Sequence, residues 1–547
     1  MLLTLHQALV AHGGPTGAEF AGRDVVRVFP VDAPGASSFT PSSTPYNPLC
    51  TENVVRASDH RNGSITLRIR TLPVATAAAV LALAVTGIGA PTAVAAPSGP
   101  ADDFNGDGYR DLAIGTPKAS GGTVTVLFGS AAGVSRTRFV NVTQNTPGVP
   151  GASESVDRFG ENVTGGDVNG DGYADLIVGA PGEEVTGKPR GSVTIVWGGA
   201  QPFTSGGIAL TAPTAEAAGF GEGAAFADLD GDGTGNLAVV GTDTFWWYAD
   251  GEPTQDGAFG PEMEFLPDGV QLDGIVAAHF SSQDGGNGFE YVLHGRQYEA
   301  DGSPMPGYLG VLRGGPGDIG SSHTVLSDDG TTGSAAWWSS AVATGDINGD
   351  GYDDLVTADE AGVEGGSFMV RYGSATGLPL KGRTYHQDSP GVPGTDEVGD
   401  DFGSALALGD VTGDGRADLA VGAPYEDVNG KRNVGDVVLL KGGADGLTTT
   451  GAQSFHQATT GVPGAAEAGD HFGSSLRLRD INGNGKADLA VGAFGEDVLP
   501  DGYDDGAAWV LRGAAAGLTT TSVTSFNATD FGYPVVSGRK FADVFAR

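Results

Sequence analysis

The chain has 547 residues, 93 of them glycine, and a formal net charge of −38 at pH 7. Glycine together with abundant valine, threonine and alanine disfavours a helical protein and favours many short strands joined by tight turns. Because 67 acidic residues outnumber 29 basic ones, the chain would repel nucleic acid phosphates and anionic lipid surfaces, and we expect no polyanion as a partner.

An apolar segment is the first element along the chain. No residue between Arg70 and Asp102 is charged, and an apolar core at 74–88 leads into small residues. This is the layout of a secretory signal, and the core is short for a membrane anchor, which is the alternative. We interpret residues 1–67 as a misassigned start or disordered extension, 68–96 as the signal peptide and 97–547 as the secreted, extracellular part, without a membrane span.

A ten-residue acidic motif then recurs along the chain. The 118-residue interval between its third and fourth copies holds two periods, so we expect a degenerate repeat near Ala278 and seven units in total. The copies begin at Asp103, Asp167, Asp228, Asp346, Asp410 and Asp480.

Each unit also carries strand signals in phase with the motif. A short apolar run follows the acidic loop, as at 176–181, and a further strand follows it, as at 191–199. Four such strands form a sheet too small to bury both faces alone, so the copies must stack. An aromatic residue stands eight positions before the first Asp of five copies: Phe159, Phe220, Trp338, Phe402 and Phe472.

The end of the chain supplies a strand that the first unit lacks. The first unit opens directly at its acidic loop, whereas an aromatic-Gly segment at 531–539 stands alone after the seventh unit. We predict that this segment pairs with the first unit and leaves no open sheet edge. The predicted fold is an all-β, seven-bladed β-propeller with four-stranded antiparallel blades, closed by the C-terminal strand.

The pattern of an aromatic-Gly pair, a DxDGDGxxD loop and a GAP turn resembles the FG-GAP repeats of the integrin α-subunit propeller and its bacterial relatives. The resemblance covers about residues 102–540. It implies a seven-bladed propeller with calcium in the loop between the first two strands of a blade.

The acidic loops offer the oxygen ligands that calcium prefers, at positions one, three, five and nine, with a backbone carbonyl at position seven. An EF-hand is excluded because position twelve of the second loop is Val178 and not Glu. A metal-free hairpin turn is the alternative, but it does not explain Asp at positions one and nine. The predicted ligands are Asp103, Asn105, Asp107, Tyr109 and Asp111; Asp167, Asn169, Asp171, Tyr173 and Asp175; Asp228, Asp230, Asp232, Thr234 and Asn236; Asp346, Asn348, Asp350, Tyr352 and Asp354; Asp410, Thr412, Asp414, Arg416 and Asp418; and Asp480, Asn482, Asn484, Lys486 and Asp488.

The loops should not bind calcium equally. The seventh keeps only Asp480 and Asp488 as carboxylates, and the fourth unit loses its acids. We predict about five or six structural Ca²⁺ sites, the weakest in unit seven and none in unit four. Since the only cysteine, Cys50, precedes the secreted part, calcium would take the stabilising role that disulfides have elsewhere.

Catalytic motifs are absent from the sequence: there is no GxSxG, HExxH or phosphate-binding loop. His386 and His456 each precede a Gln, but Thr143 fills the same place in the first unit, which favours a role in the fold. The nearby GVPG segments are interpreted as connections between blades. We therefore expect a monomeric protein-binding or adhesion module and no enzyme, with a carbohydrate-binding lectin as the alternative and a polysaccharide lyase or hydrolase less favoured.

Overall fold

The computed structural model describes residues 57–58, 66–67 and 101–546, with internal gaps. The chain divides into two compact units, 1–92 and 93–547. In the first, β1 (Ala57–Ser58) pairs with β2 (Thr66–Leu67); the predicted signal peptide lies outside the described residues. No helix among the described residues is long and apolar enough to cross a membrane. The gaps are 215–217, 230–231, 249–252, 255–257, 260–265, 282–288, 316–317, 327–340, 359–363, 499–503 and 534–537.

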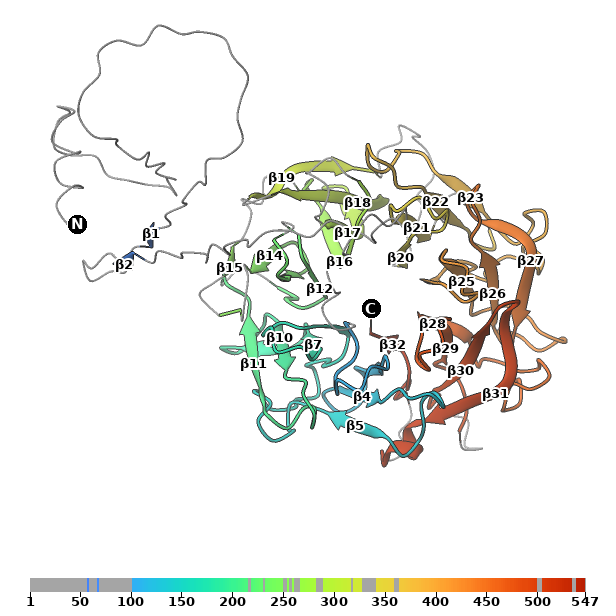
Figure 1. The fold of residues 1–547 in the computed structure, drawn as a ribbon, viewed down its shortest axis with the longest axis horizontal. Coiled ribbons are helices and arrows are strands. Elements are labelled where there is room, and N and C mark those ends of the chain that lie inside the picture. The colour runs from blue at the N-terminus through green and yellow to red at the C-terminus, as the bar shows by residue number, and fades with distance from the viewer. Residues whose placement is uncertain are drawn as a thin grey trace, which may run out of the picture. The chain divides into compact units, whose positions relative to one another are not determined.

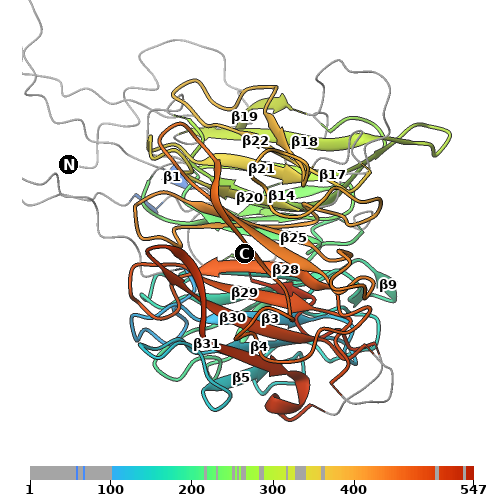
Figure 2. The ribbon, with the colours of Figure 1, turned by 90° about the vertical axis from the view of Figure 1, so that its right-hand side faces the viewer.

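The second unit is a ring of seven four-stranded antiparallel sheets, which confirms the predicted seven-bladed propeller (Figure 1). Seen from the side, β28, β29 and β30 lie next to one another in chain order (Figure 2). The first three blades contain β32 (Val544–Phe545), β3 (Leu112–Thr116), β4 (Thr123–Leu127) and β5 (Phe139–Val142); β6 (Asn162–Gly166), β7 (Asp175–Ala180), β10 (Ser192–Val196) and β11 (Gly207–Thr211); and β12 (Gly223–Ala227), β13 (Asn236–Val240), β14 (Phe245–Tyr248) and β15 (Ala258–Phe259).

The other four blades follow the same order along the chain. A further small hairpin, β8 (Glu184–Val185) with β9 (Lys188–Pro189), extends from the second blade. Blades four to seven contain β16 (Val270–Ala278), β17 (Glu290–Tyr298), β18 (Pro304–Gly315) and β19 (Asp318–Val325); β20 (Val342–Gly345), β21 (Asp354–Ala358), β22 (Phe368–Arg371) and β23 (Arg383–Tyr385); β24 (Ala405–Gly409), β25 (Asp418–Ala423), β26 (Asp436–Lys441) and β27 (Thr448–Phe455); and β28 (Phe472–Arg479), β29 (Asp488–Ala493), β30 (Ala507–Ala514) and β31 (Gly517–Asn527).

The hydrophobic core lies between neighbouring blades. One cluster joins Phe368 of β22 to Leu419 of β25, and another joins Val437 of β26 to Trp509 of β30. Because each blade is covered on both sides, its second strand is buried along its whole length, as β7 is. This double burial explains why these strands are continuous apolar runs without alternating polar residues.

The aromatic residues that stand eight positions before the acidic loops, the aromatic register, fix the spacing between blades. Phe159, Phe402 and Phe472 are almost completely buried. A Cβ added at Gly435 would lie 2.2 Å from the carbonyl oxygen of Phe472, so only glycine lets the two backbones approach this closely. Trp338, which holds the same register in the fifth unit, lies outside the described residues.

The C-terminus closes the ring as predicted, but a different segment does so. β32 pairs with β3 through Ile114–Phe545 and Gly115–Val544. The aromatic register of the closing strand belongs to Phe541, because Gly506 lies against its backbone in the way that other glycines lie against the aromatic residues of the repeats.

The prediction that 531–539 forms the closing strand is therefore wrong. Phe531 ends a short 3₁₀ helix, η2 (Ala528–Phe531), and Gly532 is its left-handed C-cap at φ 80°. The Phe-Gly pair at this point is thus a helix-ending signal. Ala542, which follows Phe541, has the positive φ (62°) that glycine adopts after the aromatic residue in the other repeats.

Candidate functional site

In blades two, three, five, six and seven the acidic loop joins the first strand of the blade to the second, as predicted, and in the first blade it leads into the second strand, β3. In the second blade the loop runs from Asp167, just after β6, to Asp175, the first residue of β7. The loops of blades three, five, six and seven connect β12–β13, β20–β21, β24–β25 and β28–β29 in the same way. Since the strands of a propeller repeat around one axis, the loops lie at the same end of their blades.

The carboxylate at position one folds each loop around itself. Asp167 Oδ1 accepts a hydrogen bond from the Asp171 N–H at 2.9 Å, and its Oδ2 accepts one from the Gly172 N–H at 2.9 Å. The same two bonds recur at Asp103, Asp228, Asp346, Asp410 and Asp480.

Positions three and five continue this pattern toward solvent. Asn169 Oδ1 also accepts from the Asp171 N–H, and Asp171 Oδ1 accepts from the Tyr173 N–H at 3.0 Å. Matching bonds from the residue at position seven reach Asp107, Asp232, Asp350 and Asp414.

The carboxylate at position nine ties the loop to the third strand. Asp175 is fully buried; its Oδ2 accepts from the Val168 N–H at 3.0 Å and its Oδ1 from the Gly198 N–H, just after β10, at 2.9 Å. Asp111, Asp354 and Asp418 make equivalent pairs of bonds. In the third blade Asn236 Oδ1 accepts the bond from the loop backbone, from the Leu229 N–H at 3.0 Å.

Burial raises the pKa of the position-nine carboxyls, and the other acids of the same loop raise it further. The pKa of Asp111 rises to about 8, with Asp103 and Asp107 contributing after burial. The pKa of Asp354 rises to about 7 for the same reasons. The acids of one loop therefore repel one another closely enough to favour a bound cation or a proton.

The donor set of these loops fits calcium. Among the described residues, no three His, Cys, Asp or Glu side chains already converge as a metal site. A carboxylate oxygen that accepts one N–H keeps a second lone pair for a metal. Hard oxygens and excess negative charge are what calcium requires. Of the predicted ligands, Asp230 lies outside the described residues.

Unit seven differs from the other loops in its third position. Asn482 Nδ2 donates to both oxygens of Asp488, at 2.9 and 2.7 Å. Its amide therefore offers hydrogens, not an oxygen, to the carboxylate at position nine, and position five is Asn484 instead of Asp. That this loop binds calcium most weakly stays a prediction.

Unit four retains a buried acid that the sequence interpretation missed. Glu290 accepts a hydrogen bond from the Phe280 N–H at 3.0 Å, as the position-nine Asp does elsewhere. Glu290 stands ten positions after its N–H donor, whereas Asp111 stands seven positions after its own. This longer spacing hides the match to the acidic motif in the sequence. Arg313 Nε lies 2.8 Å from Glu290 Oε1, so this unit supplies its own cation.

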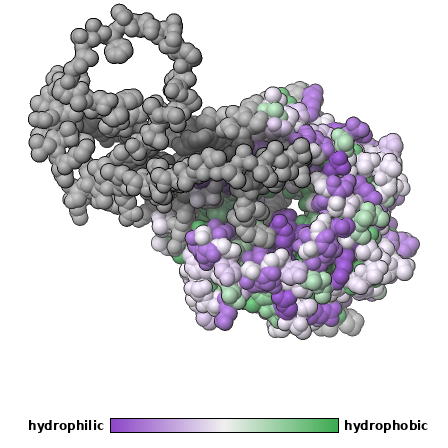
Figure 3. Space-filling view, in the orientation of Figure 1, coloured by the Kyte–Doolittle hydropathy of each residue, from purple (hydrophilic) through white to green (hydrophobic). Residues whose placement is uncertain are grey.

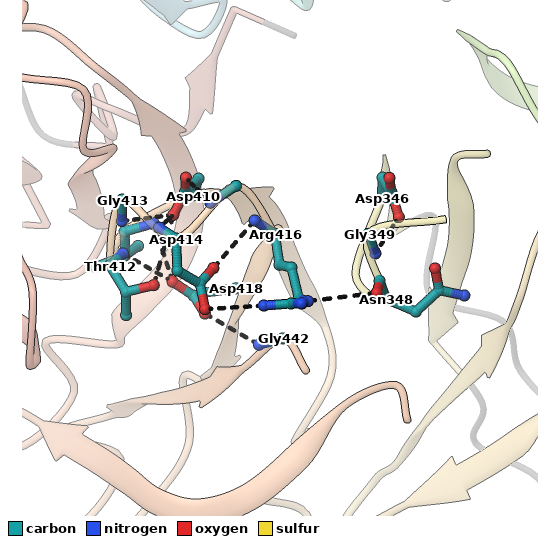
Figure 4. A network of polar contacts seen from close by, with 12 residues as sticks. Asp346, Asn348, Gly349, Asp410, Thr412, Gly413, Asp414, Arg416, Asp418 and Gly442 are labelled. Atoms are coloured by element: carbon teal, nitrogen blue, oxygen red, sulfur yellow. Dashed lines mark hydrogen bonds and ion pairs between the residues drawn. The ribbon is translucent and has the colours of Figure 1, made fainter. Parts of the chain in front are cut away.

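Position seven has a role that sequence reasoning did not assign to its side chain. Arg416 in the sixth blade reaches the loop of the fifth, where its Nε donates to the Asn348 carbonyl at 3.3 Å, while Nη1 lies 3.4 Å from Asp414 Oδ2 (Figure 4). The Ala417 N–H also donates to the Asp346 carbonyl at 2.8 Å. These contacts connect the acidic loop of the sixth blade to that of the fifth. The sequence signal for them is a large residue at position seven of one loop together with a glycine at position four of the preceding loop.

Five segments match the FG-GAP repeat family: 95–127, 159–196, 338–367, 402–440 and 472–511. The integrin alpha pat-2 of Caenorhabditis briggsae is 31% identical over 222 residues, covering 38% of this chain and 16% of the integrin. The chain carries an integrin α-like FG-GAP propeller.

Integrin alpha-5 of Xenopus laevis is 32% identical over 202 residues, or 35% of this chain and 17% of the integrin. This FG-GAP chain thus spans about a sixth of the length of the curated relatives it matches. Among solved structures, BBS1N from its complex with ARL6DN covers 69% of the chain at 12% identity with a TM-score of 0.36, a similarity too low to bear on function.

Proposed function

We propose that the FG-GAP propeller is a secreted module that binds an extracellular protein in adhesion and is stabilised by calcium. The observation that carries the proposal is the recurrence of FG-GAP repeats with similarity to integrin α subunits. We propose an adhesive and not a catalytic role, because the recurring geometry of the repeats lies in structural loops.

Calcium acts as a structural ion in this proposal. It would neutralise loops in which three acids repel one another, as Asp103, Asp107 and Asp111 do. Extracellular calcium modules bind with dissociation constants of roughly 10⁻⁴ to 10⁻³ M. Calcium at ten times its dissociation constant stabilises a fold by about 1.4 kcal/mol per site.

The test of the structural role is thermal unfolding of the purified chain with calcium and with EDTA. We expect EDTA to lower Tm by about 5 °C or more, since several sites contribute. Magnesium in place of calcium is the control, because it demands a smaller octahedral site. An unchanged Tm in EDTA would refute the structural role of calcium, but it would not bear on the fold or on the ligand.

The visible surface of the propeller is mainly hydrophilic, with small apolar areas (Figure 3). Large hydrophobic side chains that are exposed within the described residues include Val156 and Val398, both on connections that lead into an aromatic register.

Binding of the chain to immobilised extracellular proteins, compared with a glycan array, tests the class of ligand. We expect calcium-dependent binding to protein. Binding to glycans alone would favour the lectin alternative. Sequencing the N-terminus of the exported chain tests secretion, with a start after Ala95 or Ala96 expected.

A further inference from the structure

A second polar cluster recurs at the opposite end of the blades from the acidic loops. In the second blade, β7 begins at Asp175 in the acidic loop, and Glu183 stands three residues beyond its other end. Gln144 Nε2, from the connection between the first two blades, donates to Glu183 Oε2 at 2.5 Å. Asp157 lies beside them: its carbonyl accepts a hydrogen bond at 3.0 Å from the N–H of Gly182, the residue before Glu183.

The cluster is repeated with the same spacing at two other blade interfaces. Gln387 Nε2 donates to Glu426 Oε2 at 2.6 Å, and Gln457 Nε2 donates to Glu496 Oε2 at 2.5 Å; all three pairs are 39 residues apart in sequence. Asp157, Asp400 and Asp470 each stand two residues before the aromatic register and accept an N–H from the residue three positions earlier.

Several buried oxygens in these clusters lack a donor. Gln144, Gln387 and Gln457 are each 2% exposed, and the Oε1 atom of each receives no hydrogen bond within the described part of the chain. Asp157 is fully buried and its Oδ1 also has no partner there. A buried acceptor without a donor costs about 1–3 kcal/mol. The other terminal atom of each Gln, Nε2, contacts the Glu of its cluster.

The electrostatic surroundings of the clusters are negative. The charged groups that act on Asp400 are Glu426, Glu397 and Asp427, all acidic, and burial is the first cause of its pKa rise to about 7. The third cluster has Glu467 and Asp497 around Asp470, with Lys431 as an opposing charge. Each cluster therefore concentrates negative charge around oxygens that lack donors.

The fold itself does not require this cluster. At the interface between the second and third blades, the strand register places Ala212 at the position of the Gln. Ala218 stands two residues before Phe220, where the Asp would be, and Thr244 stands eight residues after Asn236, where the Glu would be. All three polar groups are thus absent together where the same blade packing persists. Because the Gln, the Asp and the Glu are present together at three interfaces and absent together at this one, they act as a unit. Residues that only filled the core could be lost one at a time.

We propose that each Gln–Glu–Asp cluster binds a hard divalent cation of calcium size between two blades. The carboxylates of Glu and Asp and the amide oxygen of Gln supply the protein ligands, and water completes the shell. A glycine of the GVPG segment leaves room for the Gln in two of the clusters: a Cβ at Gly394 would lie 2.6 Å from Gln387 Nε2, and one at Gly151 3.1 Å from Gln144 Nε2. Only two acids contribute per site, so these clusters differ in composition from the acidic loops.

Calcium stoichiometry on the full chain tests the sites by equilibrium dialysis. The variant Glu183→Gln/Glu426→Gln/Glu496→Gln should lose three calcium ions per chain relative to the wild type, one for each cluster. The matched loop variant, Asp107→Asn/Asp171→Asn/Asp350→Asn, should retain those three. A triple Glu→Gln variant that binds as much calcium as the wild type overturns the proposal.

This design separates the two sets of sites. If the acidic loops bind no calcium, the wild type binds three ions, the loop variant is unchanged, and the proposal for the clusters still stands. If only the loops bind, the loop variant loses the calcium of its three changed loops and the cluster variant loses none.

A single-site measurement covers the case in which the triple variant does not fold. Trp509 adjoins the third cluster: its Nε1 donates to the Pro463 carbonyl at 2.8 Å, and a Cβ at Gly464 would lie within 4 Å of both Trp509 and Gln457 Nε2. Terbium bound there should be sensitised by tryptophan, and both Trp509→Phe and Glu496→Gln should reduce that emission. Emission that falls with Trp509→Phe but not with Glu496→Gln overturns the assignment of the ligands.

Discussion

The ring of Tyr173 in the second acidic loop lies over Gly106 of the first. A Cβ added at Gly106 would stand 2.4 Å from Tyr173 Cε1, and the φ of Gly106 is 69°. The side chains of Tyr109, Arg416 and Lys486 cover Gly483, Gly349 and Gly413 in the same way. The position-seven side chain therefore joins each of these loops to the preceding blade.

Gly106→Ala should destabilise the propeller more than Gly108→Ala. Both glycines have positive φ, but a Cβ at Gly108 meets nothing within 4 Å, so only the first variant adds a steric clash to the backbone strain. We expect a cost above about 1 kcal/mol for backbone strain in each case and a larger one at Gly106. Urea unfolding measures both, and Tyr173→Ala should remove the difference. Equal costs would exclude the clash.

Asn484→Asp should strengthen calcium binding by the seventh loop. It restores the carboxylate that position five has in the first two loops, and its backbone N–H still bonds Asp480. The new charge repels Asp480 and Asp488, so the variant should be less stable than the wild type in EDTA and more stable in calcium. The Tm values of the variant and the wild type, each measured in EDTA and in calcium, test this reversal of their order. Asp171→Asn is the reverse control and should reduce the gain from calcium.

Arg313→Met should destabilise the fourth blade strongly. Its partner Glu290 is 1% exposed, and removing the guanidinium leaves a buried charge unpaired, at a cost of about 3 kcal/mol. Arg296→Met is the control, because its pair with Asp273 is largely exposed on the arginine side and should contribute less than about 1 kcal/mol. Adding Glu290→Gln should recover part of the loss. Similar small effects for both arginines would contradict this.

Phe541→Ala should open the ring at its closing interface. The side chain is fully buried with Phe531 and Ala528, and truncating a buried Phe costs about 3–5 kcal/mol. Lys118→Ala is the control at the same interface, since the Lys118–Asp543 ion pair is exposed and should contribute about 0–1 kcal/mol. Denaturant unfolding gives both values. A small effect of Phe541→Ala would mean that closure does not stabilise the fold.

Asp436→Asn should stabilise the sixth blade at neutral pH. Burial raises the pKa of Asp436 well above its usual value, with a hydrogen bond from Ser454 opposing this rise. Because the folded state holds this proton more tightly, its stability falls as pH increases from the unfolded pKa of about 4 toward the folded pKa. The variant cannot titrate at this position and should lack that fall. Unfolding at pH 5 and pH 8 measures it. A parallel pH dependence in both proteins would show that Asp436 does not titrate.

The repeats and their number could be predicted from sequence, because they depend on local chemistry. The loop motif specifies its own turn: Asp at position one accepts amides of its own loop, and glycines allow the bend. A period of about 60 residues with strand signals leaves stacked sheets as the way to bury an apolar face. Seven blades and the position of the loops followed from these features and are confirmed.

Other features depend on contacts between segments far apart in the chain, and only the tertiary structure decided them. Phe531 and Phe541 are both aromatic residues near the end of the chain, and nothing local reveals which one meets Gly506 of the seventh blade. Glu290 was hidden by a longer connection, and its partner Arg313 lies on another strand. The Gln144–Glu183 pair forms only when two blades meet. Side chains that act across a blade interface carry no local periodicity, so their roles emerge only once the ring has closed.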